Sequence, residues 1–496
     1  MLSPPARRIS LAVAALLLPS CAAPRHSVTW NAPADAEHAR SVETSPVVQA
    51  AYRQENPDDT VSEPATVPHE IVPVPEPIVG GDADSGPLSL GDLEQMAMEN
   101  NPSIEEAGAK VGAARGRWVQ AGLPPNPRLG YSGQQLGSGG QAEQHGVYVE
   151  QEFIRGGKLG LGRAVASQEI VHAEQQFEVQ RRRVLTDVRM GYYAVLCAQR
   201  RLELTEELVR IGNQATKAAQ DLFEKKEASR RDLLQARIES QSAQTFLQQA
   251  RNQHLAAWRM LAAVLGSPHM QPRSLVGRVD ETATELAWEN SLQRLLSESP
   301  EIAAAFVQVE RARWAVDRAR AEAVADVNVQ GIIQSDNATG STNGNLLVSI
   351  PIPVLNRNQG GIRQAESELV AAERAAQRME LAMQHRLAPV FERYLSSRNR
   401  VDNFRGGILR DAEESLKLTR QGYEAGELSF LNLLTAQRTY FQANLNYIEA
   451  LCSMWAASAE IEGLLLTNSL EEGGGTVGPA YEPAAQRGLP SMAGRL

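Results

Sequence analysis

The chain has 496 residues, a formal net charge of −10 and only 5% aromatic residues. Long stretches are rich in Ala, Gln, Glu, Arg and Leu and lack Pro and Gly, which favours long helices over compact globular cores. The mild acidity and the absence of a basic stripe argue against nucleic-acid binding. No nucleophile–base grouping or phosphate-binding loop is present, so the sequence predicts neither an enzyme nor a cofactor.

Residues 1–21 have the features of a secretory signal peptide. Arg7 and Arg8 precede an apolar run over 9–18, which is too short to cross a bilayer as a helix. The run ends in Leu-Pro-Ser followed by Cys21, which resembles a bacterial lipobox, in which the cysteine becomes the lipidated first residue. Cleavage near Ala22 without lipidation is the alternative. No other apolar stretch is long enough to predict a transmembrane helix.

Two segments flank the expected fold. Residues 22–88 are rich in Pro, Glu, Val, Ser and Asp, which predicts a disordered or polyproline-like leader. Residues 471–496, with consecutive glycines at 473–475, predict a flexible tail.

An internal repeat organises the residues between these segments. The Asn-Pro pair at 101–102 reappears as Ser-Pro at 299–300, 198 residues later, and each pair opens an Ala-rich helical stretch. Asp-Leu-Leu at 232–234 matches Asn-Leu-Leu at 432–434, 200 residues later. A repeat of this length is a duplicated domain rather than a solenoid array. The two expected units are residues 89–281 and 282–470.

In each unit, the sequence pattern predicts the same order of one helix, two short strands and two very long helices. Val147 and Val149 alternate with polar neighbours, as do Val327 and Val329, and this period-two pattern indicates strands with one apolar and one polar face. The expected opening helices span about 90–121 and 282–323. The expected strands span about 127–136, 146–154, 325–335 and 345–354. The expected tips of the helical hairpins span about 224–230 and 424–429.

The long helices carry apolar heptads, which are typical of coiled coils. The series in the first unit is Leu204, Leu208, Ile211, Ala215, Ala218 and Leu222. The series in the second unit is Phe441, Leu445, Ile448, Cys452 and Trp455. The helix from Leu159 to Phe223 would be roughly 95 Å long at about 1.5 Å per residue.

Four strands of about nine residues have the length needed to cross a membrane within a tilted β-barrel. Four strands cannot close a barrel, and open edges are not tolerated in lipid, so the chain would have to pool strands with copies of itself. Three chains would give a barrel of twelve strands. The side chains expected to line its lumen are Glu150, Glu152, Asp326, Asn328 and Gln330. A soluble coiled-coil protein with β-hairpin knobs fits the same composition.

Several motifs between residues 88 and 468 resemble those of the TolC-like outer membrane efflux proteins. The run Glu-Phe-Ile-Arg-Gly-Gly-Lys at 152–158 is similar to the Gly-Gly-Lys signature of the CzcC-like heavy-metal branch. The proline-containing run at 350–360 resembles the family's strand-to-helix junction. Gly-Tyr-Glu-Ala-Gly at 422–426, before Leu-Leu-Thr-Ala-Gln at 433–437, looks like the family's hairpin tip.

The resemblance implies a fold that is mainly α with a small β part, in which duplicated units of helical hairpins and strands trimerise into a transmembrane β-barrel and a periplasmic α-barrel. It implies a passive, non-enzymatic duct in the outer membrane, in contact with lipid. The implied partners are a periplasmic membrane-fusion adaptor and an inner-membrane pump of the resistance-nodulation-division type, and the implied cargo is heavy-metal cations. Drug efflux and type I secretion stay open, and a periplasmic coiled-coil adaptor or structural protein is the alternative from another class.

The resemblance also implies a periplasmic gate. In the family, a tyrosine of the second hairpin bonds to an aspartate of the first, and the matching residues are Tyr423 and Asp232. Such a charge-assisted bond suits a releasable latch, although Asp232 could equally face solvent near a helix start. The family's acidic constriction corresponds to Asn432 and Thr435, which carry no carboxylate, so a strongly cation-selecting ring is not expected there.

Three further expectations concern contacts and ligands. The residues expected to contact the adaptor are Lys225, Lys226, Arg230, Ala425, Gly426 and Leu428, although the charged first tip equally fits a solvated turn. The eight histidines are scattered, so no metal site is predicted. Cys197 and Cys452 are expected as buried free thiols, while a bridge stays open because both lie at similar heights above the tips.

Overall fold

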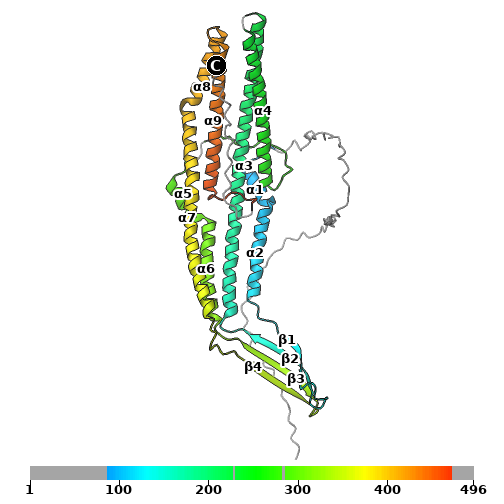
Figure 1. The fold of residues 1–496 in the computed structure, drawn as a ribbon. Helices are drawn as coiled ribbons and strands as arrows, with labels where there is room; N and C mark the ends of the chain where they lie inside the picture. The colour runs from blue at the N-terminus through cyan, green and yellow to red at the C-terminus, as the bar shows by residue number, and fades with distance from the viewer. Residues whose placement is uncertain (1–85, 227–228, 282–284, 472–496) are drawn as a thin grey trace, which may run out of the picture. The chain divides into compact units, whose positions relative to one another are not determined.

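The computed structural model describes residues 86–226, 229–281 and 285–471 (Figure 1). The expected signal peptide with Cys21, almost all of the expected leader and the tail from residue 472 lie outside the described residues. In the described ranges, no helix combines the length and apolar character needed to cross a membrane.

The two repeats contain the same succession of elements, except that the first long helix of the second repeat is interrupted. The elements are mostly helices with one small antiparallel sheet, which confirms the predicted fold class. The first repeat consists of α1 (Leu90–Asn100), α2 (Pro102–Ala121), β1 (Arg128–Gln134), β2 (Gln144–Phe153), α3 (Lys158–Glu224) and α4 (Arg230–Val264). The second consists of α5 (Trp288–Glu298), α6 (Pro300–Ala321), β3 (Val327–Asp336), β4 (Ser341–Ser349), α7 (Gln359–Asn403), the π-helix η1 (Phe404–Ile408), α8 (Leu409–Glu424) and α9 (Phe430–Glu462). We call α3–α4 hairpin one and α7–α9 hairpin two.

The opening helix of each repeat is broken in two, where the sequence predicted one continuous helix. Asn101 and Ser299 have extended backbones, with ψ of 117° and 119°, because each precedes a proline that disfavours the helical conformation. Proline then occupies the first position of α2 and of α6, where its missing N–H costs nothing. Asn101 also caps α2 by accepting a bond from the Ser103 N–H at 2.9 Å.

The four strands form one antiparallel sheet in the order β1-β2-β3-β4, so the two repeats meet at the β2–β3 pair. The first three strands lie close to their expected positions, but β4 ends at Ser349 rather than near residue 354. The physical reason is the sequence Pro351-Ile352-Pro353, since proline donates no ladder hydrogen bond and restrains the residue before it.

Hairpin one closes on small residues, and the leucine heptad of α3 does not take part in this contact. Thr205, Gly212 and Ala219 are the buried residues of α3 at seven-residue spacing, whereas Ala218 is exposed. Gly212 lies against α4, where an added Cβ would come within 3.3 Å of the Ser240 Cα. The α4 residues of the same packing repeat at the same spacing and are Ala236, Ala243 and Ala250.

The predicted leucine heptad instead joins the two repeats. Leu204, Leu208 and Ile211 of α3 surround a small gap together with Tyr440 and Phe441 of α9. The two apolar series predicted separately in each unit therefore meet one another, which places α9 beside α3 (Figure 1).

A layer of partly buried charges crosses the middle of α3 and connects it to the second repeat. Arg183 of α3 pairs with Glu301 of α6 at 3.4 Å, and Arg386 of α7 reaches the same carboxylate at 2.8 Å. One turn along α3, Asp187 accepts backbone hydrogen bonds from Asn468 and Ser469 at 3.1 and 2.6 Å. The segment that follows α9 is thereby tied down onto the first repeat.

Burial raises the pKa of the Asp187 carboxyl, although the bonds from Ser469 and Asn468 and the nearby Arg183 act in the opposite direction. A carboxyl whose folded pKa exceeds its unfolded value contributes stability that is complete below the unfolded pKa and is lost as the pH rises through the folded pKa. Asp187→Asn removes this titration. We therefore expect the melting temperature of the variant to gain relative to the unchanged protein as the pH is raised from about 4 to 8.

Thermal unfolding of both proteins across that pH range tests this. Glu285→Gln serves as the control. The hydrogen bond from Arg398 lowers the pKa of the Glu285 carboxyl, so its stabilisation is complete above the unfolded pKa and is lost only at more acidic pH. This variant should therefore show no gain as the pH is raised. If the melting temperature of Asp187→Asn does not gain on that of the unchanged protein as the pH rises, or behaves as it does in Glu285→Gln, the raised pKa of Asp187 would be contradicted.

Candidate functional site

The sheet has one apolar and one polar face, and its register shows that the faces of the two repeats coincide. Val147 lies opposite Ile333, whereas Glu150 lies opposite Gln330 and Glu152 opposite Asn328. Directly opposed residues point to the same side of a sheet. Most of the large apolar residues of the first face are more than half exposed; these are Leu129, Tyr131, Val147, Val149, Phe153, Ile333, Leu346 and Val348.

The polar face holds four of the five side chains that were expected to line a lumen, namely Glu150, Glu152, Asn328 and Gln330. The Asn328 amide donates to the Glu150 carboxylate at 2.5 Å, across the junction of the two repeats. The polar face is thus assembled from both repeats.

Both outer edges of the sheet are unpaired along the strand. β1 pairs only with β2, and β4 pairs only with β3, within the part of the chain that the structure describes. Each outer edge therefore presents free backbone N–H and C=O groups, which is a template for pairing with another strand.

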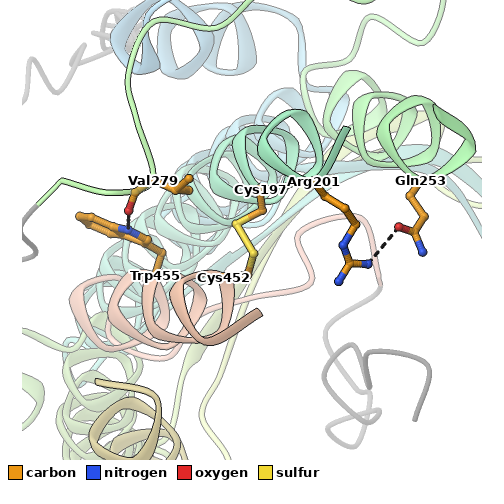
Figure 2. The surroundings of a disulfide bond; sticks show 6 residues. All are labelled: Cys197, Arg201, Gln253, Val279, Cys452 and Trp455. Atoms are coloured by element: carbon orange, nitrogen blue, oxygen red, sulfur yellow. Dashed lines mark hydrogen bonds between the residues drawn. A yellow bond between two sulfur atoms is a disulfide. The ribbon is translucent and has the colours of Figure 1, made fainter. Parts of the chain in front are cut away.

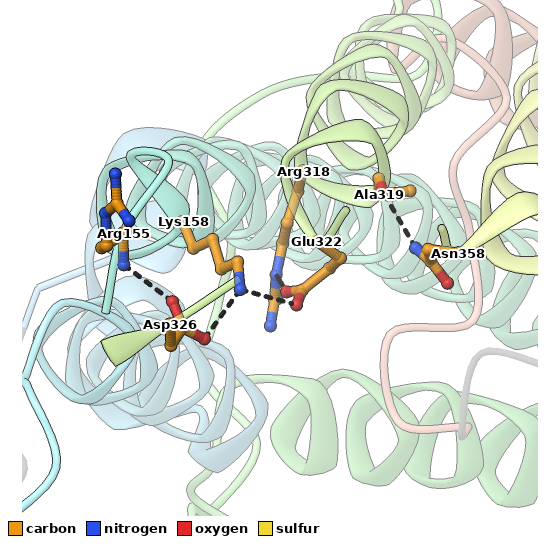
Figure 3. Close-up of polar contacts among 7 residues, drawn as sticks. All are labelled: Arg155, Lys158, Arg318, Ala319, Glu322, Asp326 and Asn358. Atoms are coloured by element: carbon orange, nitrogen blue, oxygen red, sulfur yellow. Dashed lines mark hydrogen bonds and ion pairs between the residues drawn. The ribbon is translucent and has the colours of Figure 1, made fainter. Parts of the chain in front are cut away.

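The fifth expected lumen residue, Asp326, has a different environment. It lies one residue before β3, where its carboxylate accepts bonds from the Lys158 Nζ and the Arg155 N–H, both at 2.7 Å (Figure 3). The Lys158 Nζ also lies 3.6 Å from a Glu322 carboxylate oxygen. Asp326 therefore joins the sheet to the start of α3 and the end of α6, and it is not a free lumen carboxylate.

This ion pair explains the Gly-Gly-Lys sequence in physical terms. Gly156 and Gly157 both have positive φ, 68° and 70°, which turns the chain from β2 into α3. The turn places Lys158 where its side chain is 9% exposed and bonded to Asp326. In the second repeat Asn358 takes the same left-handed position before α7, with φ of 58°, and its amide donates to the Ala319 carbonyl.

At the hairpin tips, the corresponding turn residues are Lys226 and Gly426, with φ of 64° and 77°. Lysine adopts this conformation at a cost that glycine avoids. Each following helix is capped by a serine, since Ser229 accepts from the Asp232 N–H and Ser429 from the Asn432 N–H.

The expected bond between Tyr423 and Asp232 is not formed in the described chain. The Asp232 carboxylate instead accepts from the Ser229 hydroxyl at 2.7 Å and the Ser229 N–H at 3.3 Å, completing a capping box at the start of α4. The Tyr423 ring packs against Phe430, with ring centres 5.7 Å apart. Burial and the nearby Asp232 charge raise the pKa of the Tyr423 phenol, so the two residues are neighbours without a bond.

The other expected tip residues are solvent-exposed. Asn432 and Thr435 lie on the first turns of α9, and the Thr435 hydroxyl bonds to the Leu431 carbonyl of its own helix. The exposed residues at the turns are Lys225, Lys226, Arg230, Ala425, Gly426 and Leu428. They are accessible to a partner, and their role stays a prediction.

A disulfide joins Cys197 of α3 to Cys452 of α9, so the expectation of two free thiols is wrong (Figure 2). The two Cα atoms are 6.0 Å apart and the residues are separated by 255 positions. One turn away, the rings of Tyr193 and Trp455 stack with centres 4.4 Å apart, and the Trp455 indole donates to the Val279 carbonyl at 2.9 Å. The bridge therefore lies in a packed contact between the repeats.

No group of three or more histidine, cysteine, aspartate or glutamate residues in the described ranges is arranged to hold a metal ion.

The comparison with protein families decides what this scaffold is. The model of the outer membrane efflux proteins matches residues 93–267 and 291–465, once in each repeat. The chain belongs to the outer membrane efflux protein family. Members of this family are passive channels, so this efflux protein is not an enzyme.

The chain is also similar to individual members of known function or structure. The efflux protein is 25% identical over 381 residues to the cobalt-zinc-cadmium resistance protein CzcC of Cupriavidus metallidurans, covering 77% of this chain and 90% of the relative. Among solved structures, a membrane protein of Pseudomonas aeruginosa has a TM-score of 0.65 at 21% identity, covering 76% of this chain and 92% of the other. CusC has the same TM-score and the same coverage at 19% identity, which shows a shared fold.

The disulfide should contribute strongly to stability. In the chain-entropy model, closing a loop of this length raises the free energy of the unfolded chain by roughly 5 kcal/mol. Measured stabilisation by disulfides is commonly about 2–4 kcal/mol. We expect the variant Cys197→Ala/Cys452→Ala to unfold at a markedly lower temperature. Adding reductant should lower the melting temperature of the unchanged protein but not that of the variant. Alkylation of both thiols in the folded, unreduced protein, detected by mass spectrometry, would refute the bridge.

The junction pair should also be structural. Lys158→Met keeps the aliphatic stem but leaves the Asp326 carboxylate without its cation, and we expect a loss of about 2–3 kcal/mol in the free energy of unfolding. The matched control is Lys110→Met, which removes an exposed pair with Glu106 within α2. That change should cost less than about 1 kcal/mol. Equal losses in the two variants, measured by denaturant unfolding, would show that the junction pair has no special role.

Proposed function

We propose that this efflux protein is the outer membrane channel of a tripartite efflux system of the resistance-nodulation-division type. The observation that carries the proposal is the four-stranded sheet with an exposed apolar face, a polar face and two unpaired edges, in a chain of the efflux family. In a trimer, β4 of each copy would pair with β1 of the next and close a barrel of twelve strands. The apolar face would then contact lipid.

The polar face supports a water-filled lumen. Glu150, Glu152, Asn328 and Gln330 would repeat three times around it, and carboxylates on a pore wall favour the passage of cations. The resemblance to a cobalt-zinc-cadmium resistance protein supports heavy-metal cations as cargo. The chain is a passive duct in this proposal, and an inner-membrane pump supplies the energy.

The helical hairpins would form the periplasmic part. The exposed residues at their tips, Lys225, Lys226, Arg230, Ala425, Gly426 and Leu428, provide the surface on which a periplasmic adaptor would dock. The tip region that includes Tyr423, Asp232, Asn432 and Thr435 would control the opening. A lipid chain on Cys21 would add an anchor in the outer membrane.

Deletion of the gene from its own bacterium tests the function. We expect the deletion strain to become more sensitive to zinc, cobalt or cadmium salts and to keep its tolerance of lipophilic drugs. The full-length gene should restore the metal tolerance. The membrane fraction of the complemented strain should yield a trimer after gentle solubilisation.

The outcomes discriminate among the remaining alternatives. Unchanged metal tolerance with raised drug sensitivity would replace the metal cargo by drugs, whereas a defect in protein export would indicate type I secretion. Recovery in the soluble periplasm as a monomer would overturn the channel proposal.

A further inference from the structure

The tips of the two hairpins are packed against one another by an apolar cluster. Ala219 of α3 and Leu233 and Ala236 of α4 are buried against Phe430, Leu433 and Leu434 of α9. Apolar packing of this kind is not directional, so it permits one helix to slide on another. A specific arrangement of the tips therefore requires a directional contact as well.

Glu239 and Arg438 supply such a contact. The Arg438 Nε lies 2.6 Å from the Glu239 Oε1, and its Nη2 lies 2.9 Å from the Oε2, so the pair forms two parallel hydrogen bonds between α4 and α9. The two residues are 199 positions apart. Among the ion pairs of the described residues, Glu239–Arg438 is the one that connects hairpin one to α8 or α9 of hairpin two. Bidentate arginine–carboxylate pairs fix relative orientation better than other surface pairs do.

The other side of hairpin two contains a break in its helix. The π-helix η1 separates α7 from α8, and Gly407 within it has a non-helical backbone, with φ of 175° and ψ of −35°. π-Turns and adjacent glycines interrupt the regular helical hydrogen bonds and are common positions of bending. A Cβ at Gly406 would meet no atom within 4 Å, and at Gly407 it would meet only the Asp411 carboxylate at 3.7 Å. Close packing therefore does not require glycine at these two positions. The physical effect of the two glycines is the greater freedom that they give the backbone.

The break is anchored by polar contacts on one side and followed by a sparsely buried helix on the other. Arg405 donates to the Tyr447 hydroxyl at 2.8 Å and to the Asp280 carbonyl at 2.5 Å, which holds the beginning of η1 to α9. Five residues further along α9, Cys452 is bonded to α3. Beyond the break, only Ala412 of the sixteen residues of α8, all of which are described, is buried.

We propose that the Glu239–Arg438 pair is an ionic clasp that holds the tip of hairpin two against hairpin one, and that η1 is the hinge on which α8 moves when the clasp opens. The inference rests on the proposed channel function and adds the residues that control it. It assigns to Glu239 and Arg438 the holding role that the bond between Tyr423 and Asp232 does not perform in this chain. The disulfide sets the boundary of the moving part, since it fixes α9 to α3 directly behind the hinge.

Charge reversal tests the clasp in the full-length protein, in planar lipid bilayers at about 0.1 M KCl, where exposed pairs are only partly screened. Glu239→Arg and Arg438→Glu should each raise the fraction of time that the channel conducts by about fivefold, which is the effect of losing a bidentate surface pair. The double variant Glu239→Arg/Arg438→Glu should return to within about twofold of the unchanged channel. The control is Arg420→Glu, which breaks a pair with Glu424 inside α8 and should change nothing.

Gly406→Ala/Gly407→Ala tests the hinge. Combined with Arg438→Glu, it should remove most of the gain in conduction, because alanine reduces backbone freedom without a clash. Spin labels placed through Lys225→Cys and Ala425→Cys provide a readout that does not depend on current. The distance between the labels should broaden in Arg438→Glu and narrow again in the charge-swapped variant.

The outcomes separate the clasp from the channel. Suppose that the unchanged trimers conduct, but that the conduction of the single reversals equals that of Arg420→Glu or is not restored in the double variant. This result would overturn the clasp and leave the channel proposal intact. Trimers in which no variant conducts would overturn the channel, and the label distances would then decide whether the pair holds the tips. Unchanged label distances would end the proposal in either case.

Discussion

The rest of the structure depends on the burial of one helix, α3, against partners from both repeats. α3 packs on α2 and α4 of its own repeat and on α6 and α9 of the other. Val184, Val188 and Val195 are completely buried along this contact. Because a single continuous helix runs from the sheet to the hairpin tip, the positions of the sheet, the central core and the tip are coupled through its backbone hydrogen bonds.

The contacts along α3 change in chemical character from one end to the other. At the sheet, Lys158 makes an ion pair with Asp326, and in the centre Arg183 makes one with Glu301. The disulfide at Cys197 adds a covalent tie, and beyond it the helix packs through small residues such as Gly212 and Ala219. Strong, directional ties of α3 therefore hold the part near the sheet. Toward the tips α3 packs mainly through small side chains, and the directional tie there is the Glu239–Arg438 pair between α4 and α9. This distribution fits the proposed channel, in which the end at the sheet would be fixed and the end at the tips could rearrange.

The sequence predicted the helices and strands well, but it did not predict which helices pack against one another. Period-two and heptad patterns located the strands and the long helices, because these depend on the local alternation of side chains. The heptads left open which helices they join, since a leucine series does not specify which helix it meets. The closing contact of hairpin one uses Gly212 and Ser240, whose small size has no apolar signal in the sequence. The end of β4 was misplaced because the apolar run continues through Ile352 although its prolines cannot pair.

The candidate site shows the same division. The polar face was predictable because Glu150 and Glu152 alternate with valines along one strand. The role of Asp326 was not, because its partner Lys158 is 168 positions away and only the fold brings them together. Asp232 was matched to a family position, whereas its local sequence, with Ser229 three residues earlier, already encodes a helix cap. The local capping sequence thus competes with a long-range bond for the same carboxylate, and in this chain the cap forms.

The pairing of Cys197 with Cys452 has a consequence for how the protein is made. Ribosomal synthesis and export deliver Cys197 long before Cys452, since 255 positions separate them, so the first thiol waits unpaired while most of the second repeat crosses the inner membrane. During that interval the precursor's third cysteine, Cys21, is the competing partner. Acylation of Cys21 would take its sulfur out of disulfide exchange, because a thioether cannot form a mixed disulfide. An early lipid anchor would then also protect the fidelity of oxidation, leaving one possible bridge in the mature chain.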